Sequence, residues 1–313
     1  MLTALTHSNT QGITTMKKWC SVLLLCVGIL PSLASARPLH VVAAYPYIGD
    51  LVERIGGSNV RVFSLARGDY NPHVIIPRPS YIAHVRGADL LIINGAQLEI
   101  GWMPPLLRQA NNPAVQTSEP GFLDLSQHVT LIDVPTSVSR EHGDVHPEGN
   151  PHFYLDPENI LPIAKAIRNK LVQLDSRNAQ YYEDRYREFS SLWERKLVEW
   201  AQKMAPLANA RVVEYHKNYD YFLRRYKLQI AGTVEPLPGI PPTSKHMQHL
   251  EVLLTSTPAR FVLQDVYNPD DASRHLAEKL NITLVILPHD VNAVKETTGI
   301  VSLFDELVKR ISE

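Results

Sequence analysis

Short apolar runs alternate with helically periodic segments along most of this 313-residue chain, and that alternation restricts it to folds built on a covered sheet. Because the runs are apolar on both faces, they predict strands that are buried on both sides, as is typical of parallel sheets. The predicted strands are residues 39–44, 60–65, 89–94, 130–134, 211–215, 260–264 and 283–287. The predicted helices are residues 48–55, 80–86, 219–226, 247–254, 272–280 and 300–311.

A long helical segment separates the two groups of strands. Apolar residues recur there at intervals of three and four, after a helix start at Asp156 and its following proline. We therefore predict an α/β fold with two β/α lobes, residues 37–156 and 206–313, whose parallel sheets are joined by a helical connector over 157–205.

Residues 1–36 resemble a secretory signal peptide. They contain a basic start, an apolar run over 21–33 that is short for a membrane span, and a small-residue triplet that ends at Ala36. An uncleaved anchor is the alternative, but Pro31 interrupts the apolar run. Cleavage after Ala36 would leave a periplasmic protein of 277 residues, a length that suits two lobes.

Both cysteines of the chain, Cys20 and Cys26, lie inside this leader. A lipid-attachment role for Cys26 is not favoured, because Leu25 is bulky where such a site has a small residue. The mature chain would therefore have no thiol, so that a metal site in it must use nitrogen and oxygen ligands.

The charge balance excludes one class of partner. The formal net charge is −1, and it becomes −3 without the two lysines of the leader. No basic stripe is present, so nucleic acid is not an expected partner.

Histidine is the informative residue type in this sequence. The chain has 13 histidines, and only His7 precedes the expected cleavage point. His73, His152 and His216 each follow a predicted strand, and so does Asp290. Because open α/β sheets place ligands at the carboxyl ends of their strands, we expect these four side chains to converge in a cleft between the lobes.

Three imidazoles and one carboxylate can complete a tetrahedral zinc shell. A single loop histidine is usually only solvated or hydrogen-bonded, so it is the joint pattern that carries the prediction. Prolines directly precede His73 and His152 and restrict the approach of both residues. Since only neutral histidine binds a metal, we expect the affinity for zinc to decrease as the pH drops below about 6.5.

Several motifs, in order along the mature chain, resemble the zinc- and manganese-binding solute-binding proteins of bacterial ABC transporters. The motifs are Asn71-Pro72-His73, Pro79-Ser80, Ala88-Asp89-Leu90, Asn94-Gly95, Leu98-Glu99, Trp102, Pro151-His152-Phe153-Tyr154-Leu155-Asp156-Pro157, His216 with Tyr219, Tyr221 and Phe222, and Pro238-Gly239-Ile240-Pro241-Pro242-Thr243.

This resemblance implies two lobes joined by a rigid long helix, one metal ion at their interface, and delivery of that ion to a membrane permease without catalysis. Manganese members usually have a carboxylate where this chain has His216, so the resemblance favours zinc. We expect a monomer whose partners are an ABC permease and, as a further candidate, a periplasmic metallochaperone.

Two positions depart from the family pattern or leave it open. Asn71 stands where an acidic residue is common, which would leave the surroundings of the ion less negative. The fourth ligand could be His289 or Asp290, and the family pattern favours the aspartate.

The segment 135–150 is polar and without periodicity, and it contains His142 and His146. Zinc-binding members often carry a histidine- and acid-rich loop here, so these two histidines are candidates for secondary metal capture. An ordinary surface loop is the equally weighted alternative.

A zinc hydrolase is the competing class of function. Glu214 is the best local candidate for a general base, but no H-E-x-x-H helix, nucleophile elbow or phosphate loop accompanies it. His246 and His249 lie three apart in a predicted helix and lack a third ligand nearby. The carrier interpretation is therefore preferred to the enzyme.

Overall fold

The computed structural model describes residues 1–5, 37–136 and 146–313. Residues 38–313 form one compact unit, and Met1–Arg37 form a separate one. Most of the predicted signal peptide, and His142 of the polar loop, lie outside the described residues. Within the described part, no helix is both long enough and apolar enough to cross a membrane.

The first sheet has four parallel strands in the order β2-β1-β3-β4. Its strands are β1 Leu39–Ala43, β2 Val60–Ser64, β3 Leu90–Ile93 and β4 Phe122–Asp124. The helices that follow its first three strands are α1 Pro46–Gly56, α2 Pro79–Arg86 and α3 Met103–Ala110. The central strands are buried on both faces, as their unbroken apolar sequences predict.

The second sheet repeats this arrangement, with four parallel strands in the order β6-β5-β7-β8. Its strands are β5 Arg211–Glu214, β6 Gln229–Thr233, β7 Phe261–Asp265 and β8 Thr283–Leu287. Its helices are α6 Asp220–Arg225, α7 Ser244–Ser256, α8 Asp271–Leu280 and α9 Ile300–Ser312. In both sheets the chain reverses its direction of strand addition at the first strand, and such switch points are where α/β sheets bind ligands.

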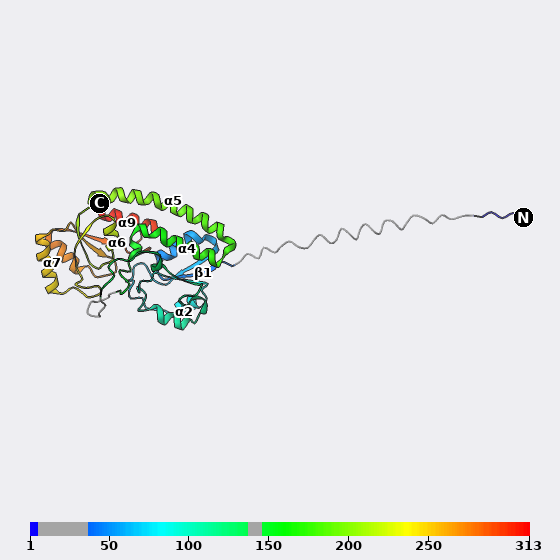
Figure 1. Cartoon of the computed structure of the whole chain (residues 1–313), viewed down its shortest axis with the longest axis horizontal. Helices are drawn as coiled ribbons and strands as arrows, with labels where there is room; N and C mark the ends of the chain where they lie inside the picture. The colour runs from blue at the N-terminus through cyan, green and yellow to red at the C-terminus, as the bar shows by residue number, and fades with distance from the viewer. Residues whose placement is uncertain (6–36, 137–145) are drawn as a thin grey trace. The chain divides into compact units, whose positions relative to one another are not determined.

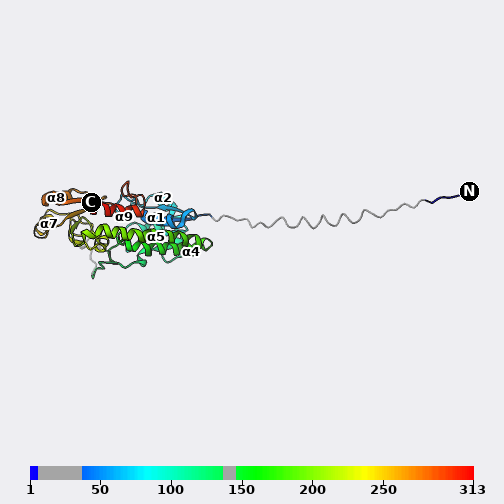
Figure 2. The ribbon, with the colours of Figure 1, turned by 90° about the horizontal axis from the view of Figure 1, so that it is seen from above.

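Two helices, α4 Ile160–Leu174 and α5 Ala179–Met204, connect the sheets (Figure 1). The 26-residue α5 packs against α1 and α4 and also against α9, and Figure 2 shows α9 alongside it. Trp193 Nε1 donates to the Pro157 carbonyl at 2.8 Å, and Trp200 Nε1 donates to Asp305 Oδ1 at 2.8 Å. Buried indole anchors with satisfied N–H groups fix a helix in place, so α5 forms a rigid brace along the connected lobes.

The structure confirms the α/β class, the two parallel sheets and the long connector, and it corrects two strands. Residues 130–134 are not a strand; the fourth strand is β4, whose three residues gave too short a signal. Instead, the amide of Ile132 donates to Tyr221 Oη at 3.0 Å, and its carbonyl accepts from the Asn150 amide. β6 was missed altogether, because its sequence includes glycine and polar residues.

Candidate metal centre

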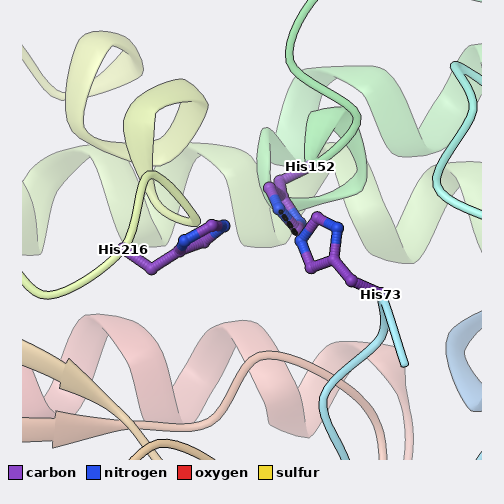
Figure 3. Close-up of side chains that lie close together, drawn as sticks. All are labelled: His73, His152 and His216. Atoms are coloured by element: carbon purple, nitrogen blue, oxygen red, sulfur yellow. Dashed lines mark hydrogen bonds between the residues drawn. The ribbon is translucent and has the colours of Figure 1, made fainter. Parts of the chain in front are cut away.

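Three of the four predicted ligands lie together. Within the described residues, His73, His152 and His216 form a group whose candidate ligand atoms are all within 4.8 Å of one another. Figure 3 shows the rings of His73 and His152 in contact, with the ring of His216 pointing toward them from the opposite side. His216 lies two residues after the end of β5, at the switch point of the second sheet.

The two histidines from the first half of the chain already have the spacing of a ligand pair. Nε2 of His73 lies 3.2 Å from Nε2 of His152. Two nitrogens bound to one tetrahedral zinc ion at about 2.05 Å would be about 3.3 Å apart. The donor set and this spacing therefore fit a divalent ion bound between the two rings.

The same type of turn positions both His73 and His152. The His73 amide donates to Asn71 Oδ1 at 2.9 Å, and the His152 amide donates to Asn150 Oδ1 at 2.9 Å. In each Asn-Pro-His triplet, the asparagine side chain closes a turn over the proline, whose φ is fixed. Asn71 thus has a structural role: its amide oxygen accepts from the backbone N–H of the first ligand, as a carboxylate oxygen there also could.

Asn150 also joins the second ligand to the third. Its Nδ2 donates to the Lys217 carbonyl at 2.9 Å and to Asp220 Oδ2 at 2.9 Å. One buried amide therefore fixes the backbone that carries His152 and the turn that follows His216. These hydrogen bonds therefore fix the position of His152 relative to His216.

The imidazole of His216 is oriented by a carboxylate that the sequence interpretation missed. Nδ1 of His216 donates to Glu235 Oε2 at 2.7 Å, and the same oxygen accepts from the Gly239 amide at 2.9 Å. Because a carboxylate only accepts, Nδ1 carries the proton and Nε2 keeps its lone pair for a metal. The missed strand β6 is the reason for this omission, since Glu235 follows it closely.

Asp290 does not belong to the group of ligand atoms that all lie within 4.8 Å of one another. Its Oδ1 accepts from the amides of Tyr47, at 2.8 Å, and Val291, at 2.6 Å. Burial raises the pKa of this carboxyl well above its ordinary value. The role of Asp290 as fourth ligand stays a prediction.

His289, the alternative to Asp290, is buried and hydrogen-bonded to the other side of the cleft. Its Nε2 donates to the Tyr70 carbonyl at 3.1 Å. A carbonyl cannot donate, so Nδ1 keeps its lone pair, and among the described residues this nitrogen has no hydrogen-bond partner.

Two tyrosines also position the site. Tyr45 Oη donates to the carbonyl of Pro72, directly before the first ligand, at 2.9 Å. Tyr47 supplies the amide that holds Asp290. Both follow β1, the switch-point strand of the first sheet.

Beside the histidines is a cavity of about 430 Å³. Its wall includes His146, His152, His216 and Glu235, together with prolines and a leucine of the 236–238 segment. The candidate ligands are thus reached from a space far larger than one ion.

The residue proposed as a hydrolytic base is not placed for that chemistry. Glu214 lies in β5 and is fully buried. Burial raises its pKa well above the ordinary value, and the adjacent Asp220 raises it further. A buried carboxyl paired in this way has no route to a water molecule on the ion.

Comparisons with known proteins agree with this site. A family model described as "ZnuA: Zinc-uptake complex component A periplasmic" matches residues 41–313. The metal ABC transporter substrate-binding lipoprotein SloC of Streptococcus mutans is 26% identical over 227 residues, covering 69% of this chain and 71% of that protein. The manganese ABC transporter substrate-binding lipoprotein PsaA of Streptococcus pneumoniae is 25% identical over 268 residues, covering 80% of this chain and 83% of that protein.

A crystal structure of ZnuA has the same fold, with a TM-score of 0.74 and 22% identity over 88% of this chain and 98% of that one. The family match spans most of the chain and includes all three clustered histidines. The chain therefore belongs to the ZnuA family, and it is a metal-binding, substrate-binding component of an ABC transporter and not an enzyme.

Proposed function

We propose that this protein captures one zinc ion outside the cytoplasmic membrane and delivers it to an ABC permease. The observation that carries the proposal is the group of His73, His152 and His216, whose three imidazoles supply only nitrogen donors. Nitrogen-rich sites favour zinc over manganese, both through ligand softness and through the Irving–Williams order. Asp290 is proposed as the carboxylate of the family pattern, and residues 1–36 as a cleaved signal peptide.

The same proposal includes lobe boundaries at residues 156 and 205 and a monomeric state. It also includes supply of zinc by a periplasmic metallochaperone. Secondary capture by His142 and His146 is a further part, and only the second of these histidines lies in the described residues. The alternative function is manganese carriage, because PsaA relatives are named as manganese-binding.

Titration of metal-free protein with zinc and with manganese tests the proposed ion. We expect one tight zinc equivalent per chain and weaker manganese binding, measured by calorimetry with a competing chelator. Loading should also raise the melting temperature, because a ligand at a thousand times its Kd stabilises the native state by about 4 kcal/mol. Tighter binding of manganese than of zinc would reverse the assignment of the ion.

The pH dependence of zinc binding should be shallow between pH 7.5 and 6.0. Burial lowers the pKa of His73 and of His152 well below 6.5, and neighbouring histidines lower both further. A lowered pKa keeps an imidazole neutral as the pH falls, so protons compete less with the metal for these two ligands. Three unperturbed imidazoles would lose about fifty-fold in affinity over this range.

We therefore expect a loss well below fifty-fold, measured by chelator competition at each pH with corrections for the chelator's own protonation. An undiminished fifty-fold loss would show that these two rings are not buried in the metal-free protein.

A further inference from the structure

His146 is held beside the metal centre by a tight turn. The amide of Gly149 donates to the His146 carbonyl at 3.0 Å, with Pro147 at the second position of the turn, where its fixed φ is favoured. Gly149 has φ +119°, and a Cβ there would lie 2.7 Å from the carbonyl oxygen of Ile132. The turn is thus built from local sequence and fitted closely against the segment before the polar loop.

The turn places the His146 ring against the ligand group. The ring centroids of His146 and His73 are 5.2 Å apart, with the planes inclined by 30°. His146 also lines the 430 Å³ cavity together with His152 and His216. Three of the four imidazoles therefore line the cavity, and the fourth, that of His73, stacks on the ring of His146.

One nitrogen of the His146 ring lacks a hydrogen-bond partner among the described residues. This nitrogen is Nε2, and it is buried. A buried polar atom without a partner costs on the order of 1–3 kcal/mol, so such an atom calls for an explanation. A metal ion in the adjacent cluster would supply its partner.

The fourth coordination position is open to this ring. Asp290 is held by two backbone amides and does not belong to the group of ligand atoms that lie within 4.8 Å. His146 is also outside that group, but its ring adjoins the cavity and can turn about two side-chain bonds without moving the backbone.

We propose that His146 is the fourth ligand of the transported ion, in the position that the family pattern would give to Asp290, and that it approaches the ion from the cavity side. This inference rests on the proposed function and makes it more specific, because a shell of four imidazoles favours zinc over manganese more strongly than one with a carboxylate. His146 thus belongs to the centre and is not only part of a capture loop.

The test uses full-length mature protein labelled with ¹⁵N-histidine and loaded with one equivalent of zinc. Two-bond ¹H–¹⁵N correlation spectra distinguish metal-bound from free imidazole nitrogens. We expect four metal-bound imidazoles in the wild type, three in His146→Gln and four in the control His275→Gln, since His275 is an exposed residue of α8. Zinc affinity should fall about 10²-fold in His146→Gln, because one of four ligands accounts for about 3–4 kcal/mol of the binding free energy.

A second readout separates ligation from a structural role of the turn. The ratio of zinc to manganese affinity should decrease in His146→Gln and in His146→Ala. A loosened turn would instead weaken the binding of both ions equally. Circular dichroism of the metal-free variants verifies their fold. Three bound imidazoles in the wild type, unchanged in His146→Gln, would overturn this inference alone, whereas a wild type that binds no zinc would overturn the proposed function.

Discussion

Replacing His216 by alanine is expected to weaken zinc binding by about 10²–10³-fold. Structural zinc sites are worth roughly 10–16 kcal/mol, so one of four ligands accounts for about 3–4 kcal/mol, and each 1.4 kcal/mol is tenfold in Kd. His216 should be near the top of this range, because it is the clustered ligand contributed by the second sheet. Of the three clustered histidines, its loss would leave only His73 and His152 on the ion.

Chelator competition measures the effect, with His275→Ala as a matched control on the exposed face of α8. His142→Ala provides the ordering test, since a capture residue should affect equilibrium affinity less than a ligand. A larger loss in His142→Ala than in His216→Ala would overturn the assignment of the centre.

Replacing Glu235 by glutamine should weaken zinc binding by about 10–100-fold, although Glu235 does not reach the ion. Carboxylates that accept the second N–H of a ligating histidine fix its tautomer and raise its basicity, and their loss typically has this magnitude. Glutamine retains an oxygen that can accept from His216 Nδ1, so the change removes the negative charge while preserving the size of the side chain. We expect the loss mainly in the dissociation rate of zinc.

The control is Glu251→Gln, because the Glu251 side chain is also largely buried and pairs, from α7, with Lys279 of α8 at 2.6 Å. Both variants lose one charge of the same type, but only Glu235 contacts a candidate ligand. An affinity within twofold of wild type in Glu235→Gln would show that the hydrogen bond does not tune the centre.

Much of the architecture could be predicted from periodicity, and the errors have a physical cause. Apolar runs such as 41–44 and 261–263 are buried on both faces, so burial and sequence pattern coincide there. β4 has only three residues, and β6 is polar and partly exposed, so neither has a run to detect. Residues 130–134 include three apolar residues, yet Asp133 has a φ of +54°, and Ile132 bonds to Tyr221 and Asn150 in place of a neighbouring strand.

For the site, the sequence by itself determined the ligand chemistry and the presentation of two ligands. Absence of cysteine after residue 36 restricts the donors to nitrogen and oxygen. Each Asn-Pro-His triplet closes its own turn through a hydrogen bond that spans two residues, so it needs no distant partner to orient His73 or His152.

Only the tertiary structure decided what surrounds those ligands. The partner of His216 is Glu235, 19 residues away, and the amide that holds Asp290 belongs to Tyr47, 243 residues away. The lowered pKa values of His73 and His152 likewise come from burial, which no local pattern encodes. Hydrogen bonds within a turn depend on neighbouring residues alone, whereas the close approach of these distant groups depends on how both sheets pack against the connector.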